Sequence, residues 1–236
     1  MKHLDDFYEN GFTTFDDVYR KDEVDNILQQ IDQANIDKAT FKKSADLFAI
    51  RQFLNEVPSA LNMIINEKLK RLLKEVFRDK YFVVKSIFFD KPPTSNWHVS
   101  CHQDLTISVD KKYELHGFDH WTTKQNHFAV QPPLAILQSI VTVRIHLDDT
   151  DKDNGALKVV PGSHLNGIHR AETINWSGEQ QVYCDVSQGG VMLLKPLLLH
   201  SSSRTTNYKR RRVIHVEFCN QELQPELQWA ERININ

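Results

Sequence analysis

The sequence predicts a mainly β domain, a barrel or a sandwich, that follows a helical N-terminal segment. Residues 1–80 show helical periodicity, whereas residues 81–220 contain short runs of aromatic and β-branched residues, which favour strands. Turn sequences such as Asp153-Asn154-Gly155 and Pro161-Gly162-Ser163 separate these runs. Closely spaced strands with turns between them are typical of barrels and sandwiches rather than of alternating βαβ units.

Two amphipathic stretches predict helices in the N-terminal segment. In the first, Val24, Ile27, Leu28 and Ile31 recur at helical spacing. The second runs from Pro58 to Val76 and repeats the pattern with six aliphatic residues: Leu61, Ile64, Ile65, Leu69, Leu72 and Leu73. Each helix would therefore bury one apolar face.

The predicted strands begin with the run from Tyr81 to Phe89. The later candidates are Val99 to Val109, Leu134 to Leu147, Ala156 to Val160, Gln181 to Asp185, Gly190 to Leu199 and Arg212 to Phe218. The longest stretch without a strand pattern, Asp110 to Pro133, is expected to be an irregular loop, and loops of that length are usually functional or mobile. Because no repeat or low-complexity linker divides the chain, residues 1–236 are predicted to form one domain.

Size and composition indicate a globular protein of a reducing compartment. The 236 residues are 40% hydrophobic, enough for a real core, and the net charge of −2 gives no field that favours nucleic acid or an anionic membrane. The three cysteines, Cys101, Cys184 and Cys219, lack C-x-x-C spacing and argue against a disulfide framework. Without a signal core or a run of about 18 apolar residues, we expect a cytoplasmic protein with no membrane partner.

The clearest chemical signal is the H-x-D step of His102 and Asp104, together with His200 at the end of the run VMLLKPLLL. Two imidazoles and one carboxylate can occupy one face of an octahedral metal ion and leave three positions open, as in non-haem Fe(II) oxygenases. A lone H-x-D step also occurs by chance in exposed strands. The pairing with a distant histidine therefore carries the metal hypothesis.

Regular alternation would give the strand around the H-x-D step two distinct faces. One face would carry His98, Ser100, His102 and Asp104, and the other Trp97, Val99, Cys101 and Gln103. The first face is polar, so it must point either to solvent or into a cavity. In this interpretation His200 reaches the same cavity from a different strand.

A basic run from Lys209 to Arg212 precedes the last predicted strand. Its simplest interpretation is a solvated turn, and contact with nucleic acid is a second one. If the strand continues to Phe218, however, Arg211, His215 and Glu217 share a face, and one of the arginines could point inward. An inward guanidinium needs a carboxylate partner, because burying an unpaired charge is costly. The distal carboxylate of a dicarboxylic cosubstrate could form that pair.

Taken in order, several segments resemble the phytanoyl-CoA dioxygenase family of Fe(II)- and 2-oxoglutarate-dependent oxygenases. They are FYENGFTTF near the start, FFDKPP, HQDL at 102–105, RIHLDD at 144–149, NGALKVVPGSH at 154–164, and His200, Ser202 and Arg211 in the order H-x-S…R. By itself, NGALKVVPGSH is interpreted as structural, because Asn-Gly suits a tight hairpin turn and Pro-Gly ends a strand. The ordered combination covers most of the chain and is much more specific than any one segment. A stretch like WTTKQNHFAVQPP is common in the bacterial branch of the family, whose substrates are mostly unassigned.

The resemblance implies a double-stranded β-helix (a jelly roll, cupin-like) with N-terminal helices packed on one sheet. Residues 1–80 would be the mainly helical buttress, and residues 81–220 the jelly-roll core. Carried over by position, His102, Asp104 and His200 would ligate Fe(II), which leaves room for 2-oxoglutarate and O2.

The resemblance also implies a cosubstrate site. Arg211 would pair with the distal carboxylate of 2-oxoglutarate, with the hydroxyl of Ser202 assisting. Arg210 and Arg212 are alternatives, and the spacing from the second histidine and the hydrophobic pair that follows select Arg211. Gln138, expected on the strand before RIHLDD, is a further candidate contact. Arg144 either reaches the substrate or pairs at the surface with Asp148 or Asp149.

The reaction implied is hydroxylation of an unactivated C–H bond of a small or medium-sized organic molecule, with release of succinate and CO2. Related halogenases have a small residue at the position of Asp104, so the carboxylate favours hydroxylation, or a related desaturation or ring closure. One alternative is a jelly-roll metalloprotein that does not use 2-oxoglutarate, which would not need an inward Arg211. Another is a non-catalytic binding module that retains the fold. The sequence leaves open the substrate, the involvement of a CoA thioester, and the choice between monomer and homodimer.

Overall fold

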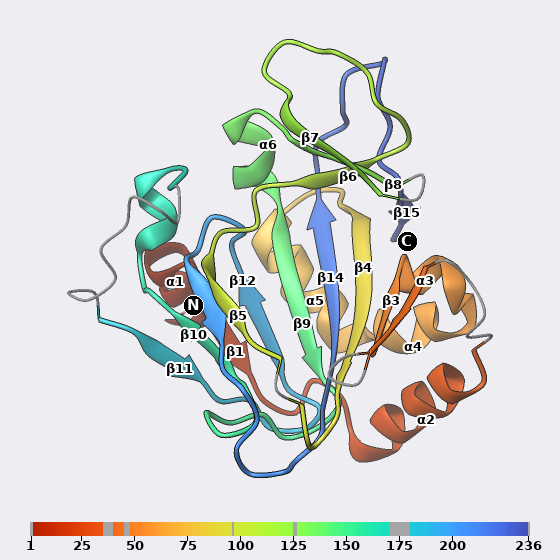
Figure 1. Cartoon of the computed structure of the whole chain (residues 1–236), viewed down its shortest axis with the longest axis vertical. Helices are drawn as coiled ribbons and strands as arrows, with labels where there is room; N and C mark the ends of the chain where they lie inside the picture. Colours follow the sequence, from red (N-terminus) through yellow and green to blue (C-terminus); the bar gives the residue numbers. More distant parts are fainter. Residues whose placement is uncertain are drawn as a thin grey trace.

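Two antiparallel sheets that face each other form the centre of the protein (Figure 1). The computed structural model describes residues 2–34, 40–44, 48–95, 97–124, 127–169 and 180–235. The larger sheet has eight strands and the smaller one has four, and both contribute side chains to one cavity between them. This is the double-stranded β-helix predicted from the sequence, and the prediction of the fold is confirmed.

The larger sheet is ordered β1-β12-β9-β14-β4-β3-β2, with β15 also pairing with β4. Its strands are β1 (Phe12–Phe15), β2 (Phe41–Lys43), β3 (Phe48–Arg51), β4 (Phe82–Lys91), β9 (Val141–His146), β12 (Val191–Leu194), β14 (Arg211–Cys219) and β15 (Ile233–Asn234). Side chains alternate along β14 as predicted: Ile214, Val216 and Phe218 enter the core under the helices, whereas Arg211 and His215 face the smaller sheet. The larger sheet therefore presents a polar inner face.

The smaller sheet is ordered β11-β10-β13-β5 and carries the histidines of the predicted metal site. Its strands are β5 (Val99–His102), β10 (Leu157–Val159), β11 (Val182–Cys184) and β13 (His200–Ser202). A third sheet, β6-β8-β7, consists of β6 (Ile107–Val109), β7 (Asp119–Lys124) and β8 (His127–Gln131), and lies at the top of the molecule in Figure 1. Hydrophobic packing between the two main sheets involves β10 and β12, through Leu157, Val159, Met192 and Leu194.

The N-terminal helices are α1 (Lys2–Asn10), α2 (Lys21–Asp32), α3 (Phe53–Glu56), η1 (Pro58–Ala60), α4 (Leu61–Ile64) and α5 (Glu67–Phe77). Their apolar faces pack on the outer face of the larger sheet, as Leu69 and Leu73 of α5 do. The prediction of a single helix from Pro58 to Val76 is wrong, because the helical conformation is interrupted at Asn66. That residue is extended, and its side-chain oxygen accepts a hydrogen bond from Leu69 N at 2.9 Å, which caps a new helix. The described part of residues 1–80 also supplies three strands that were not predicted.

Two predicted strands are interrupted, and the predicted loop contains strands. The run from Leu134 to Leu147 begins as helix α6 (Leu134–Ser139), which starts directly after Pro133, and only β9 is a strand. The run from Val99 to Val109 ends as a strand at His102 and resumes at Ile107. The loop predicted from Asp110 to Pro133 contains β7 and β8, which pair as a hairpin. The alternation signal was missing in β7 because five of its six residues are exposed.

The C-terminal segment is attached to the middle of β4 by a buried carboxylate. Glu231 is 2% exposed, and its two oxygens accept hydrogen bonds from the backbone N–H and the hydroxyl of Ser86, both at 2.6 Å. Burial raises the pKa of Glu231 to about 7, although the bonds from Ser86 act in the opposite direction. The folded protein therefore retains a proton here at pH values where the unfolded chain has released it.

This raised pKa predicts a pH dependence of stability. Between pH 4.5 and 7 the unfolded state loses its proton first, so the free energy of unfolding falls as the pH rises through that window. Glu231→Gln should remove this contribution, and its free energy of unfolding relative to wild type should rise by up to about 3 kcal/mol from pH 4.5 to pH 8. Urea unfolding at several pH values measures it, with the exposed Glu226→Gln as a control. Parallel curves for wild type and Glu231→Gln would contradict the expectation.

No helix in the described ranges is long and apolar enough to span a membrane.

Candidate active site

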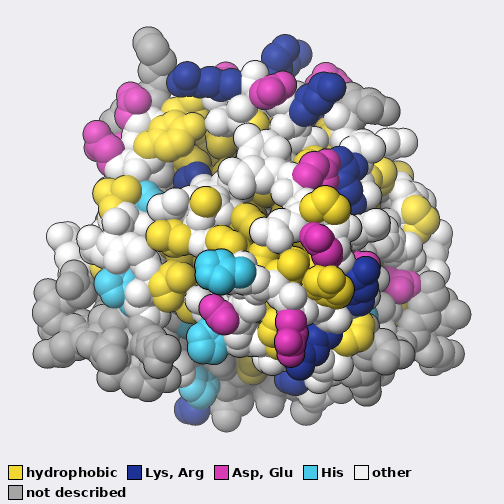
Figure 2. Space-filling view, turned by 90° about the horizontal axis from the view of Figure 1, so that it is seen from above, with side chains coloured by type: hydrophobic (Ala, Val, Ile, Leu, Met, Phe, Trp, Pro, Cys, Tyr) yellow, Lys and Arg dark blue, Asp and Glu magenta, His cyan; other side chains and the backbone are white. Residues whose placement is uncertain are grey.

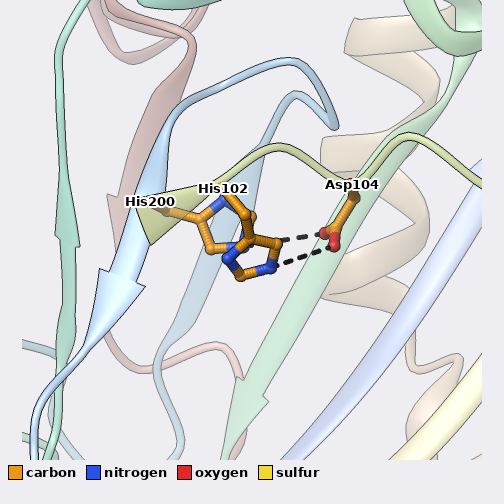
Figure 3. A group of neighbouring side chains, drawn as sticks. All are labelled: His102, Asp104 and His200. Carbon is orange, nitrogen blue, oxygen red and sulfur yellow. Dashed lines mark ion pairs between the residues drawn. The ribbon is translucent and has the colours of Figure 1, made fainter. Parts of the chain in front are cut away.

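The structure brings His102, Asp104 and His200 together at the inner face of the smaller sheet (Figure 3). The Nε2 atoms of His102 and His200 lie 3.6 and 3.8 Å from the two carboxylate oxygens of Asp104. Figure 3 shows both imidazoles on the same side of that carboxylate, with their rings 4.4 Å apart between centroids. The three ligand atoms therefore converge on one point, as a metal site requires.

Strand pairing places the two histidines opposite each other. His200 of β13 is the direct partner of His102 of β5, whereas Ser202 is the partner of Val99, so β5 has one extra residue between these pairs. This β-bulge changes the faces predicted from regular alternation. Val99 and His102 both face the cavity, and Ser100, which was predicted to share the face of His102, is exposed.

Asp104 follows the end of β5 and is not part of a strand. Its backbone N–H donates to Pro196 O at 2.9 Å, and the side chain of the preceding Gln103 donates to Leu197 O at 2.6 Å. The chain is thus fixed against the segment that leads to His200, and the turn directs the carboxylate toward both imidazoles. The triad meets as predicted, but not through an i, i+2 strand pair.

Both imidazoles are held through Nδ1. The Nδ1 atoms of His102 and His200 each lie 2.8 Å from a backbone carbonyl oxygen, of Ser100 and Leu198. Because a carbonyl can only accept, each Nδ1 carries a proton, and each Nε2 is directed at Asp104. Such a fixed tautomer is typical of metal-binding histidines.

Electrostatics favour the ligand-competent charge states of Asp104 and His200. Burial alone would raise the pKa of Asp104, but His200, His102 and Lys85 together lower it below its ordinary range. Burial lowers the pKa of His200 to about 4, despite the opposing effect of Asp104. Burial would also lower the pKa of His102, but its interaction with Asp104 leaves it raised. At neutral pH the site thus presents an ionised carboxylate beside a neutral imidazole.

The triad opens into a cavity of about 240 Å³ that also contains Arg211. Arg211 is 4% exposed, and its Nε and Nη1 atoms have no hydrogen-bond partner among the described residues. Burial, and then repulsion from Arg144, lowers the pKa of Arg211 to about 9. The adjacent arginines are each paired elsewhere, Arg210 with Asp90 and Arg212 with Asp148. Of the three arginines, the predicted one therefore points inward with donors to spare.

Arg144 lies in the same cavity. The alternative that it pairs at the surface with Asp148 or Asp149 is wrong, because Arg144 is 8% exposed and Asp148 pairs with Arg212. Its Nε has no partner in the described part of the chain, and its Nη1 is 3.5 Å from the Nδ1 of His215. Burial lowers the pKa of Arg144 to about 10, although Asp104 opposes this. The cavity thus holds two guanidinium groups with unused donors.

The other two predicted cosubstrate residues differ in placement. Ser202 lines the cavity, but its hydroxyl donates to Gly155 O at 3.0 Å, so its one proton is already used. Gln138 lies on α6 rather than on a strand, and it is exposed and absent from the cavity lining. The helix that begins after Pro133 carries it away from the inner face of the larger sheet. Ser202 therefore stays a candidate, whereas the placement of Gln138 gives its predicted contact no support.

A buried ionic group next to the triad was not predicted. Lys85 donates to Glu217 at 2.8 Å, and the same carboxylate oxygen lies 3.0 Å from the Nε2 of His215. Glu217 and His215 also come within 4.8 Å of a carboxylate oxygen of Asp104. A lysine inside the hydrophobic run YFVVKSIFF was the available signal, because a charge in a buried strand needs a partner.

Comparison with known proteins identifies the family. A family model described as Phytanoyl-CoA dioxygenase (PhyH) matches residues 7–213, which include the triad and Arg211. The chain belongs to the phytanoyl-CoA dioxygenase family. The predicted family and the predicted enzyme class, a non-haem Fe(II)- and 2-oxoglutarate-dependent oxygenase, are thereby confirmed. Membership does not establish the substrate of this phytanoyl-CoA dioxygenase family member.

Three known proteins are similar to this chain, one in sequence and two in fold. The Phytanoyl-CoA dioxygenase domain-containing protein 1 homolog of Caenorhabditis elegans is 26% identical over 239 residues, covering 87% of this chain and 74% of that protein. The structure of HygX from Streptomyces hygroscopicus with nickel, 2-oxoglutarate and hygromycin B bound aligns with a TM-score of 0.68 and 16% identity, covering 100% of this chain and 96% of that one. The structure of EctD from S. alaskensis with 2-oxoglutarate and 5-hydroxyectoine aligns with a TM-score of 0.71 and 17% identity, covering 92% of this chain and 75% of that one. At 16–17% identity, these two structures show that this chain shares their fold.

Proposed function

We propose that this protein hydroxylates an unactivated C–H bond of a small organic molecule, with iron held by His102, Asp104 and His200 and with 2-oxoglutarate bound by Arg211. The observation that carries the proposal is that Arg211 lines the same cavity as the triad, with Nε and Nη1 atoms that have no hydrogen-bond partner among the described residues. A buried cation without a counterion is costly, and a dicarboxylate whose other end reaches the metal would remove that cost. A jelly-roll metalloprotein that does not use 2-oxoglutarate would have no need for this group.

The donor set fits iron. Two neutral imidazole nitrogens and one ionised carboxylate are the ligands of the facial arrangement that leaves three positions open. The fixed Nδ1–H tautomers support this assignment, because the Nε2 atoms need no reorientation to bind. The two histidines come from adjacent strands joined by backbone hydrogen bonds, and Asp104 comes from the segment directly after β5, so the site is formed by the fold itself.

The cavity also fits 2-oxoglutarate, as judged by its unused donors. Arg211 would bind the distal carboxylate in a bidentate manner, and Arg144, on the neighbouring strand, would donate to an oxygen of the cosubstrate or of the substrate. Bound together, Fe(II) and 2-oxoglutarate supply the oxidation: O2 is consumed, 2-oxoglutarate yields succinate and CO2, and one oxygen atom enters the substrate. The protein supplies the metal ligands and the cationic groups that orient the cosubstrate in the cavity.

The presence of a carboxylate at position 104 supports hydroxylation as the outcome. Asp104 occupies the position at which related halogenases have a small residue, and its two oxygens lie toward both histidines. An ionised carboxylate that fills this position leaves no room for a halide ligand. Desaturation or ring closure would use the same residues, so product analysis distinguishes these outcomes from hydroxylation.

Anaerobic titration of the metal-free protein with Fe(II) and then 2-oxoglutarate tests the proposal directly. We expect a weak visible charge-transfer band that appears only when both are present and that is lost in Asp104→Ala. Tight iron binding without a band would refute the role of Arg211 and favour a metalloprotein that does not use 2-oxoglutarate. Failure to bind iron would favour a non-catalytic module.

A further inference from the structure

A second, wider cavity of about 1130 Å³ adjoins the metal cavity. The two share Lys85 and Ile87 as lining residues, so they meet at the inner face of β4. The wider cavity lies between the β2–β4 end of the larger sheet, the third sheet and the C-terminal segment that includes Trp229 and Glu231. A molecule in this space could therefore present one end to the metal cavity.

Strand register connects Arg51 to the metal cavity. Arg51 of β3 is the partner of Ile87 of β4, Ile87 is the partner of His215, and His215 is the partner of Arg144. Partner residues project to the same face of a sheet, so these four side chains form one row across its inner face. His215 and Arg144 line the metal cavity, and Arg51 lies at the far end of the row in the wide cavity.

The wide cavity contains more unused positive than negative charge. Lys42 is the partner of Ala49, two residues before Arg51, so both cations project to the inner face of β2 and β3. Lys124 lines the cavity from the third sheet. The side chains of Lys42, Arg51 and Lys124 form no hydrogen bond or ion pair with any residue in the described ranges.

The carboxylates of the wide cavity are already engaged. Asp110 accepts a hydrogen bond from Gln228 N at 2.9 Å. Glu231 accepts hydrogen bonds from the backbone N–H and the hydroxyl of Ser86, and Lys85 is paired with Glu217. The charged donors that remain for a ligand among the described lining residues are therefore those of the cations, beside neutral polar side chains such as Gln52, Thr122 and Gln228.

The lining of the wide cavity also offers apolar and aromatic surface. Ile87 lies at the junction, and Phe128 and Trp229 line the wide cavity from the third sheet and the C-terminal segment. Seen from above, the end of the molecule at which the third sheet lies has hydrophobic and His side chains near its centre, and Lys and Arg side chains interspersed with Asp and Glu toward its margin (Figure 2). An apolar body with a charged end would match this order of surfaces.

We infer that the substrate is an organic anion whose body fills the wide cavity and whose carboxylate, sulfonate or phosphate group is bound by Arg51, with Lys42 and Lys124 nearby. The bond to be oxidised would lie at the opposite end, past Ile87 and beside the triad. This inference rests on the proposed function for the reaction, but the anion site itself does not depend on iron or 2-oxoglutarate. Arg51 is thus assigned as a specificity-determining residue.

Two fluorescent probes of similar shape test the anion site without a known substrate. 8-Anilinonaphthalene-1-sulfonate is an aromatic anion, and N-phenyl-1-naphthylamine is its uncharged counterpart. We expect the anion to bind the metal-free protein more tightly than the neutral probe, and Arg51→Gln to weaken the anion about tenfold while leaving the neutral probe unchanged. Arg71→Gln, an exposed arginine of α5 outside the cavity, is the matched control and should change neither affinity.

A cavity-filling variant ties the probe to this site. Ala129 of β8 lines the wide cavity, and Ala129→Trp should abolish binding of both probes. Equal affinity of the two probes for wild type, an unchanged affinity of the anion in Arg51→Gln, or normal binding to Ala129→Trp would each overturn the inference. Because the readout needs neither cofactor, these results are separate from a failure of the Fe(II) and 2-oxoglutarate titration.

Discussion

Asp104→Ala is expected to lower the rate of 2-oxoglutarate consumption by roughly a thousandfold or more, equivalent to about 4 kcal/mol of lost transition-state stabilisation. The carboxylate is the only anionic member of the triad, and its two oxygens lie 3.6 and 3.8 Å from the two Nε2 atoms that would share the metal. Alanine at this position leaves two imidazoles that repel each other when protonated and no charge to balance a divalent ion. The measurement is succinate formation under aerobic conditions with saturating Fe(II).

The variant must be shown to be folded. Circular dichroism and thermal unfolding should remain close to wild type, because the backbone bond from position 104 to Pro196 O does not involve the side chain. Asp79→Ala, an exposed carboxylate after α5, is the matched control and should retain full activity. Wild-type succinate formation by a folded Asp104→Ala protein would exclude the triad as the metal site.

Arg211→Ala is expected to raise the KM for 2-oxoglutarate by about thirtyfold or more, because truncating one side of a buried charge pair costs at least about 2 kcal/mol. The affinity for Fe(II) should change little, since Arg211 does not belong to the triad. The measurement is succinate formation as a function of 2-oxoglutarate concentration, with iron affinity determined separately. Both quantities are needed, because a general disturbance of the cavity would shift them together.

Arg204→Ala provides the control for this prediction. Arg204 is exposed, lies between the second histidine and Arg211 in sequence, and lines neither cavity. Its removal should leave the KM for 2-oxoglutarate unchanged. If Arg211→Ala behaved in the same way, Arg144 would become the better candidate for the distal carboxylate, because its Nε is also without a partner among the described residues.

Most of the fold could be predicted because periodicity reports burial. The alternation along β14 separates Ile214 and Val216 from Arg211 and His215, and the structure places them on opposite faces as expected. The errors occur where the periodicity of apolar residues does not reflect the local structure. The exposed strand β7 has no apolar alternation, so it was not predicted. In the run from Pro58 to Val76 the apolar residues keep helical spacing throughout, although the helix is interrupted at Asn66, which caps the next helix.

Most of the site could be predicted because its residues form an ordered motif. The placement of Arg144 and the ion pair of Lys85 with Glu217 could not, because each depends on which strands become neighbours. Gln138 illustrates the same limit: a helix rather than a strand precedes β9, and the side chain is directed to solvent. The register between strands is a tertiary property, so it cannot be predicted from the local pattern of residues in one strand.

Because of the bulge in β5, the metal site depends on the register between strands as well as on the identity of its residues. Because Ser100 and Cys101 of β5 lie opposite the single Ser201 of β13, the extra residue turns His102 inward while Val99 stays inward. Deleting Ser100 or Cys101 would keep the whole H-x-D…H…R motif in the sequence. Val99 and His102 would then lie two residues apart, so regular pairing would keep both side chains facing the cavity without a bulge. At the present length, regular pairing would instead turn either Val99 or His102 away from the cavity, so a variant that lost only the bulge would retain every ligand in its sequence without an assembled site.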